Sequence, residues 1–278
     1  MTNLHPVIAE ALAGFAPPRV EPDMPAADYH AHPAVSKSLL DRMAKSPLHA
    51  RAYLDGAIEP ATPAMLFGTA LHTAVLEPAR YAAEYAVFEG DRRTKDGKAT
   101  YEKLIASGKS IISAADADVI SAMVSSILQH PVAAKLLTEG VVEHSVFWTH
   151  PRTGLECKAR PDYWRQNHGM VVDLKTTEDA SPAGFARSIA AYRYHVQAAH
   201  YLDGTMAARF VFIAIEKKAP YAVGVYELDP ASLTAGASLR ARDIEQYASC
   251  VEFNAWPGYS PEIQTIALPK WATNQEEI

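Results

Sequence analysis

The stretch Arg160-Pro161-Asp162, followed by Val171-Val172-Asp173-Leu174-Lys175, decides the fold of this chain. A polar run at Gln166–Gly169 separates two segments rich in apolar and aromatic residues, which predicts a β-hairpin. Because side chains alternate along a strand, Asp173 and Lys175 should face one side of the sheet and their apolar neighbours the other. We therefore expect the hairpin to bring both aspartates and the lysine into one cleft.

These three side chains suit the hydrolysis of a phosphodiester. Two carboxylates match the preference of Mg2+ for oxygen ligands, so Asp162 and Asp173 are candidate metal ligands. Lys175 could orient or deprotonate a water, or neutralise the charge that develops. Taken alone, an Asp-X-Lys triplet is more typical of a surface ion pair on an edge strand, which stabilises a protein little.

Two further motifs flank the hairpin in sequence. Gly68-Thr69-Ala70-Leu71-His72 lies in the apolar segment 64–76, and Gln197-Ala198-Ala199-His200-Tyr201 lies in the segment 194–206. Gln197 and Tyr201 are four residues apart and should share one helical face. The alternatives are a packed core histidine at His72 and an ordinary amphipathic pair at Gln197 and Tyr201.

Together, the four motifs resemble the PD-(D/E)XK nuclease superfamily and, within it, the RecB-like exonucleases. The residues in and around the motifs are most similar to those of the nuclease domain of exodeoxyribonuclease VIII (RecE), over roughly residues 29–227. The resemblance implies an α/β fold with a restriction-endonuclease-like core, in which a mixed sheet is flanked by helices, and with helical N-terminal and C-terminal additions.

The resemblance also implies roles for individual residues. It assigns a divalent cation, Mg2+ with Mn2+ as a substitute, to His72, Asp162, Asp173 and the carbonyl of Leu174. It assigns catalysis to Asp162, Asp173 and Lys175, with Gln197 and Tyr201 lining the site. Glu77 and Glu143 match recurrent acidic positions and are possible accessory residues.

The implied activity is a Mg2+-dependent exodeoxyribonuclease that degrades linear double-stranded DNA from its ends, 5′ to 3′, in recombination. Relatives work with a single-strand annealing protein of the RecT type and form rings, so both an annealing partner and a ring-shaped homo-oligomer are expected. Two alternatives stay open: a structure-specific or flap endonuclease of the same superfamily, and a catalytically silent DNA-binding protein on this scaffold.

The formal charge of −6 is unusual for a DNA-binding protein, because neutralised phosphates supply most non-specific affinity. Local basic residues must then make the contacts. Arg92, Arg93 and Lys95 lie in a charged segment, residues 91–98, that we expect to be a lid or a DNA-contacting loop, or else a solvated loop. Ser36, Lys37 and Arg160 could hold a 5′ phosphate; an ordinary helix cap and a structural arginine are the alternative.

Composition indicates one globular unit. Residues are 49% hydrophobic and 21% charged, which excludes wholesale disorder. We expect a Pro-rich, loosely packed N-terminal arm at 1–33 and a single nuclease domain at 34–278. Two cysteines, Cys157 and Cys250, cannot supply the four thiolates of an iron–sulfur cluster. Neither a signal peptide nor a membrane span is expected, so the predicted compartment is the cytoplasm.

Periodicity and turn residues predict the elements. Helices are expected at 36–44, 47–54, 63–76, 114–129, 182–190, 194–206 and 231–253. Strands are expected at 85–88, 142–149, 155–164, 170–176, 210–216 and 221–228, with a further edge strand possible at 263–268.

Overall fold

The computed structural model describes residues 17–57 and 60–268. The helices are α2 (Ala26–Ala31), α3 (Lys37–Lys45), α4 (Pro47–Leu54), α5 (Pro63–Leu76), α6 (Pro78–Glu84), α7 (Lys95–Ala106), α8 (Ala114–Gln129), α9 (Pro131–Leu136), α10 (Pro182–Ala191), α11 (Tyr194–Thr205) and α12 (Pro230–Phe253), with a 3-10 turn at Gln166–His168. The strands are β1 (Arg19–Glu21), β2 (Tyr85–Phe88), β3 (Ser110–Ser113), β4 (Val141–Val142), β5 (Ser145–Thr149), β6 (Glu156–Ala159), β7 (Tyr163–Arg165), β8 (Met170–Thr177), β9 (Arg209–Glu216) and β10 (Val223–Glu227).

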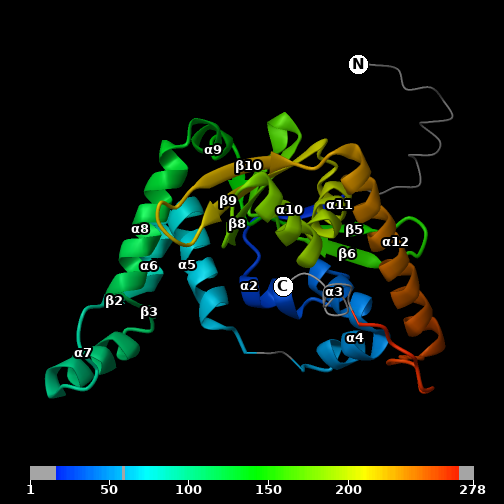
Figure 1. The fold of residues 1–278 in the computed structure, drawn as a ribbon, viewed down its shortest axis with the longest axis horizontal. Coiled ribbons are helices and arrows are strands. Elements are labelled where there is room, and N and C mark those ends of the chain that lie inside the picture. The colour runs from blue at the N-terminus through cyan, green and yellow to red at the C-terminus, as the bar shows by residue number, and fades with distance from the viewer. Residues whose placement is uncertain (1–16, 58–59, 269–278) are drawn as a thin grey trace, which may run out of the picture.

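A mixed five-stranded sheet forms the centre of the molecule, in the order β10-β9-β8-β7-β4 (Figure 1). β8 and β9 run parallel, and the other pairs are antiparallel. A parallel pair needs a long crossover, which α10 and α11 supply between β8 and β9. Mixed sheet and flanking helices confirm the expected fold class.

Each face of this sheet has its own hydrophobic core. On one face, Leu174 and Ile213 pack with residues of α5 and α8 such as Leu71 and Met123. On the opposite face, Phe212 packs with residues of α3, α10, α11 and α12. Because β8 and β9 are covered on both faces, nearly every residue in them is buried. Asp173 differs from its apolar neighbours in β8, because it is a fully buried carboxylate.

Two strands that the sequence predicted as continuous are each broken. The segment expected as one strand at 142–149 is divided into β4 and β5, because Glu143 has a positive φ of 54°. The segment expected at 155–164 is divided into β6 and β7 around Pro161, which has no amide proton for a ladder. At the first break the chain passes from the five-stranded sheet to a separate sheet, ordered β1-β5-β6, and at the second break it returns to the five-stranded sheet.

The expectation of a loosely packed arm is wrong for its last part. β1 pairs with β5, and Tyr29 of α2 is buried against Phe147. Residues 1–16 of the predicted arm lie outside the described residues. The division into an arm and a single domain stays a prediction.

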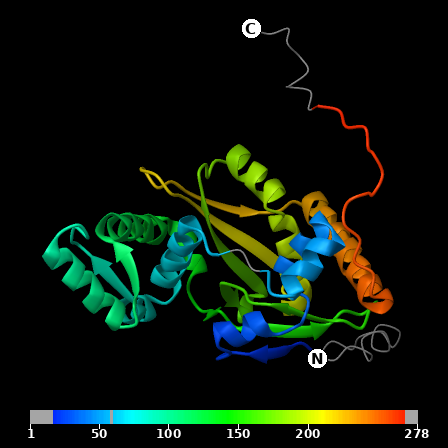
Figure 2. The same cartoon turned by 90° about the horizontal axis from the view of Figure 1, so that it is seen from below.

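β2, β3 and α7 form a lobe at one end of the molecule, which Figure 2 shows projecting from the main sheet. α8 joins this lobe to the core, because it contacts β2 and β3 as well as β9. α6, α7, β3 and α9 were missed by the sequence prediction. α7 begins at Lys95, so the segment 91–98 is a short loop followed by a helix rather than an extended lid. The possible edge strand at 263–268 is wrong, because these residues are irregular. In the described ranges, no helix has both the length and the apolar character to cross a membrane.

The close contact between α11 and β5 gives a prediction about stability. An added Cβ at Gly204 would lie 2.3 Å from Cζ3 of Trp148. The indole cannot move away easily, because its Nε1 donates a hydrogen bond to Asp203 (2.9 Å). Gly204→Ala should therefore lower the free energy of unfolding in urea by about 1–3 kcal/mol. Gly68→Ala is the matched control, because a methyl there meets no atom within 4 Å and should cost no stability.

Candidate active site

The β7–β8 hairpin places the two aspartates side by side, as predicted. Tyr163 pairs with Val172, and the turn ends at Gly169 in the left-handed region. Asp162 comes directly before β7, and its Oδ2 accepts a hydrogen bond from the backbone amide of Leu174 (2.8 Å). The register thus fixes the Asp162 carboxylate next to the residue that follows Asp173.

Asp173 is fully buried and has two side-chain neighbours. Its Oδ1 accepts a hydrogen bond from Nε2 of Gln197 on α11 (2.6 Å). Its Oδ2 lies 2.5 Å from Nζ of Lys175 and forms an ion pair with this ammonium. Asp173 and Lys175 therefore share one face of β8, as the alternation of side chains predicted, while α11 covers them.

Burial and charge set the protonation of this pair. Burial raises the pKa of Asp173 above its ordinary value, although the Lys175 ammonium acts in the opposite direction. Burial alone would lower the pKa of Lys175, but the carboxylates of Asp173 and Asp162 outweigh it and hold the pKa above its ordinary value. The ring centroid of Tyr194 lies 4.8 Å from Nζ and adds a cation–π contact. Lys175 is therefore an ammonium at neutral pH.

His72 approaches the site from α5. The Oγ1 of Thr62 caps this helix by accepting a hydrogen bond from the amide of Met65, and Pro63 occupies its first turn. His72 lies on the third turn, with its Nδ1 3.4 Å from Oδ2 of Asp162. The structure therefore brings the histidine of the G-X-X-X-H motif to the aspartates.

The two accessory glutamates also lie at the site. Glu143 occupies the break between β4 and β5, and its amide donates a hydrogen bond to the carbonyl of Asp162 (3.3 Å). Burial and then the nearby Asp162 carboxylate raise the pKa of Glu143 to about 8. Glu77, which joins α5 to α6, contributes to the same field and accepts a hydrogen bond from Arg80 (2.8 Å). Glu143, Glu77 and Asp162 therefore lie close enough together to repel one another when they are charged.

Tyr201 lies one turn after Gln197 on α11, as their spacing predicted. Its ring packs edge-to-face on Phe210, with centroids 6.1 Å apart. Burial, reinforced by the phenol of Tyr29 and by the acidic residues of the site, raises the pKa of Tyr201 well above its usual value. The phenol stays protonated, so towards a phosphate it can act only as a hydrogen-bond donor.

The donor set fits a divalent cation in its chemistry. Carboxylate oxygens, one imidazole and the Leu174 carbonyl are ligands of the kind that Mg2+ or Mn2+ takes. Gln197 binds Oδ1 of Asp173, whereas Oδ2 faces the Lys175 ammonium and is the oxygen that could also bind a cation. Within the described part of the chain, no three His, Cys, Asp or Glu side chains form a cluster already arranged to hold a metal. Asp173 would have to exchange part of its contact with Lys175 for the ion.

The three groups predicted to hold a 5′ phosphate have other partners. The Oγ of Ser36 caps α3 by accepting a hydrogen bond from Leu39, and Lys37 pairs with Asp41 (2.6 Å). Arg160 donates hydrogen bonds to the Oγ of Ser145 and the carbonyl of Met24, and its guanidinium lies over the ring of Tyr29. These contacts match the alternative of an ordinary cap and a structural arginine, and a DNA role for the three stays a prediction.

The basic segment predicted to contact DNA lies in the projecting lobe. Arg93 forms an ion pair with Asp91 (2.8 Å), and the guanidinium of Arg92 lies 4.0 Å from the ring centroid of Tyr101. Lys95 is an exposed residue at the start of α7. None of the three contacts the hairpin, so a role in binding DNA stays a prediction.

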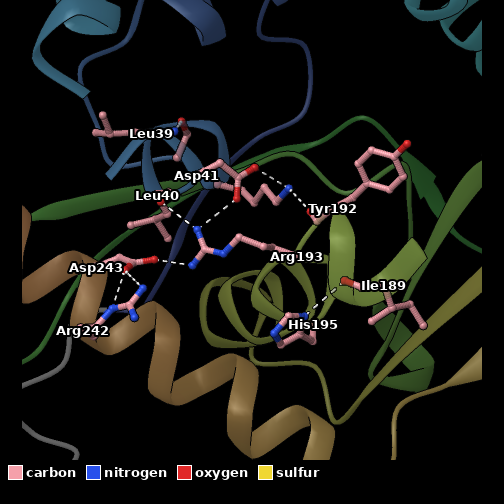
Figure 3. A network of polar contacts seen from close by, with 11 residues as sticks. Leu39, Leu40, Asp41, Ile189, Tyr192, Arg193, His195, Arg242 and Asp243 are labelled. Atoms are coloured by element: carbon pink, nitrogen blue, oxygen red, sulfur yellow. Dashed lines mark hydrogen bonds and ion pairs between the residues drawn. The ribbon is translucent and has the colours of Figure 1, made fainter. Parts of the chain in front are cut away.

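Sequence reasoning missed the network that holds the start of α11. Arg193 has a positive φ of 55° and makes contacts with the Leu40 carbonyl, Asp41 and the buried Asp243 (Figure 3). Arg242 also pairs with Asp243. This network ties α3 and α12 to the turn that precedes Gln197. No local signal in the sequence joins residues so far apart. Tyr194 could have been found, because it lies three residues before Gln197 on the same helical face.

Comparison with protein families gives a match over most of the chain. A family described as a PDDEXK-like domain of unknown function (DUF3799) matches residues 36–269, a range that includes the hairpin and both flanking motifs. The chain belongs to this family. The match confirms the predicted PD-(D/E)XK superfamily, whereas the closer likeness to exodeoxyribonuclease VIII stays a prediction.

One solved structure shows the same fold at low sequence identity, and a second aligns more weakly. A candidate exonuclease from Eubacterium rectale superposes with a TM-score of 0.62 and 11% identity, over 92% of this chain and 99% of the other. A phage-related exonuclease from Haemophilus somnus 129PT aligns over 80% of this chain and 96% of the other, with a TM-score of 0.35 and 13% identity. Comparison with curated protein sequences finds no match.

The raised pKa of Glu143 predicts that replacing this residue stabilises the protein, and that the gain is larger at high pH. Between the ordinary pKa of a glutamate and about 8, the unfolded chain releases this proton while the folded protein keeps it, so Glu143 costs more stability as pH rises. Glu143→Gln removes that cost. In EDTA, it should raise the free energy of unfolding by about 1–3 kcal/mol at pH 8 and by much less at pH 5. Denaturant titrations at both pH values measure this, with Glu262→Gln as the exposed control; an equal effect at both pH values would contradict the assignment.

Proposed function

We propose that this protein is a Mg2+-dependent exodeoxyribonuclease that digests one strand of linear double-stranded DNA from 5′ to 3′. One observation carries the proposal: the buried Asp173, held by Gln197 and Lys175, adjoins Asp162 across the hairpin. The PDDEXK-like character of its family supports a nuclease, and so does the fold shared with the Eubacterium rectale protein.

The acidic residues would hold the cation in this proposal. Asp162 and Asp173 are the principal ligands, with His72 and the carbonyl of Leu174 as further ones. When bound, the cation supplies Lewis-acid polarisation of the scissile phosphate. The Gln197 amide fixes Oδ1 of Asp173 and so restricts rotation of the carboxylate. Gln197 is therefore a positioning residue.

Lys175 contributes positive charge rather than a base. Because the Asp173 and Asp162 carboxylates hold its pKa above the ordinary value, it stays protonated at neutral pH. Of the roles expected from sequence, this favours orienting the attacking water and neutralising charge over abstracting a proton. A fixed ammonium in a buried site stabilises developing negative charge without reorganisation.

The wider setting belongs to the same proposal and rests on the resemblance of the motifs. It comprises action on DNA ends in recombination, a single-strand annealing partner of the RecT type and a ring-forming homo-oligomer. Mn2+ in place of Mg2+ and a cytoplasmic location complete it. A ring would let weak individual contacts hold the duplex despite the formal charge of −6.

Replacing Lys175 should separate turnover from metal binding. Lys175→Ala should lower the turnover of linear duplex by about 100- to 10,000-fold, because a positioned charge next to the reacting phosphate is lost. The Mg2+-induced shift in thermal unfolding should remain, since the carboxylate ligands remain. Lys135→Ala, on the exposed surface of α9, is the matched control. Turnover within a few-fold of the unsubstituted protein would remove Lys175 from the mechanism.

The form of the DNA should decide the mode of attack. With Mg2+, we expect progressive loss of linear duplex from its 5′ ends and no cleavage of a covalently closed circle, because the circle has no end to enter. Linear duplexes labelled at one end or the other, alongside the circle, measure both properties. Nicking of the circle would instead identify an endonuclease, and binding without any hydrolysis would identify a catalytically silent protein.

A further inference from the structure

A groove of about 540 Å3 lies beside the site, between the first half of α5 on one side and the end of β8, α10 and the start of α11 on the other. Its lining includes Met65, Gly68, Ser188, Tyr192 and Tyr194. Tyr194 also contacts Lys175, and Gly68 lies one helical turn before His72, so the groove continues directly from the candidate active site. Nothing in the proposed chemistry uses this groove.

An aromatic platform forms one wall of the groove. The side chain of Tyr192 is 62% exposed, and its ring stacks on Tyr194 with centroids 5.5 Å apart and planes at 27°. The backbone below it is fixed, because Lys37 donates a hydrogen bond to the Tyr192 carbonyl (2.9 Å) and Arg193 is held by acidic residues (Figure 3). A rigid, exposed aromatic face next to a reaction centre is suited to stacking on a flat ligand.

The opposite wall of the groove is formed by α5, where Gly68 leaves space because it has no side chain. Gly68 lies inside α5, where glycine costs about 1 kcal/mol relative to alanine. An added Cβ would meet no protein atom within 4 Å, so packing does not explain this residue. A ligand that lies close against the helix backbone would explain it. Met65, which is 59% exposed one turn earlier, adds an apolar surface on the same wall.

The charges in the groove favour a base over a phosphate. The groove is lined by two acidic and two basic side chains: Glu178, Asp179, Arg187 and Lys217. Glu178 pairs with Lys217, and Asp179 pairs with Arg187. A DNA backbone needs an excess of positive charge. A neutral, polar-edged nucleobase does not, and every base offers a face that can stack on an aromatic ring.

We propose that this groove seats an unpaired nucleobase of the DNA strand adjoining the scissile phosphate, stacked on Tyr192. The inference rests on the proposed function and deepens it, since it requires the end of the duplex to open before the strand reaches Lys175. Tyr192 is then a substrate-positioning residue, and recognition is tolerant of sequence because stacking does not read the edge of the base.

Removing the ring and removing the base should have the same effect. Tyr192→Ala should lower kcat/KM on linear duplex about tenfold, whereas Tyr192→Phe and Tyr192→Trp should keep it. On duplexes with abasic sites at the last three positions of each strand, the unsubstituted protein should lose a similar factor. Tyr192→Ala should then cause no further loss. Phe253→Ala, an exposed aromatic residue at the far end of α12, is the control.

Gly68→Ala provides a second test, in which stability should rise and activity should fall. The methyl should raise the thermal unfolding temperature, since it improves the helix without a clash, and it should lower kcat/KM by narrowing the groove. A merely structural role for Gly68 would move both quantities in the same direction. Unchanged activity together with raised stability would leave the groove without a ligand at this wall and overturn the inference.

The outcomes separate this inference from the proposed function. If the unsubstituted protein hydrolyses no DNA, the proposed function fails; fluorescence anisotropy in EDTA, with single-stranded oligonucleotides with and without bases, then tests the stacking by itself. If the unsubstituted protein is active but Tyr192→Ala matches it, the platform does not bind substrate. An equal loss for Tyr192→Ala on normal and abasic DNA would show that the ring does not act on a base and would overturn the inference.

Discussion

The site depends on the buried carboxylate of Asp173. Asp173 lies in the middle of β8, where all its neighbours in the strand are covered by helices, and burying such a charge without partners would be prohibitive. Gln197 and Lys175 make it tolerable, one by a hydrogen bond and the other by charge. That requirement links the sheet to α11. It also leaves Oδ2 of Asp173 paired with Lys175, and this is the oxygen that a cation would bind.

The strand breaks at Glu143 and Pro161 are the second constraint. At Glu143 the chain leaves the central sheet for the smaller one, and at Pro161 it returns. The backbone amide of Glu143 joins the two breaks through the Asp162 carbonyl. Unpaired strand ends expose side chains that a continuous ladder would direct into a core. Here they place Asp162 beside His72 and Glu143 beside Asp162. The same carboxylates repel one another, and this repulsion adds to burial in raising the pKa of Glu143.

The Arg193 network fixes the start of α11 against α3 and α12. Arg193 joins the carbonyl of Leu40, Asp41 and Asp243 around the turn before α11, with two of these partners on α3 and one on α12. The N-terminal helices are therefore part of the support of the site rather than a separate addition. The same turn carries Tyr192, so the network also sets the wall of the groove beside Lys175.

Local pattern determined much of this protein. The hairpin, the shared face of Asp173 and Lys175, and the helical pair Gln197 and Tyr201 follow from alternation and helical spacing, which act over a few residues. Only the tertiary structure decided the rest. The breaks at Glu143 and Pro161 depend on the passage of the chain between two sheets. The contacts of Lys37 with the Tyr192 carbonyl and of Arg160 with the Met24 carbonyl join residues that are distant in sequence. Long-range packing selects among arrangements that local preferences leave equal, so neither the groove nor the Arg193 network could be predicted from sequence.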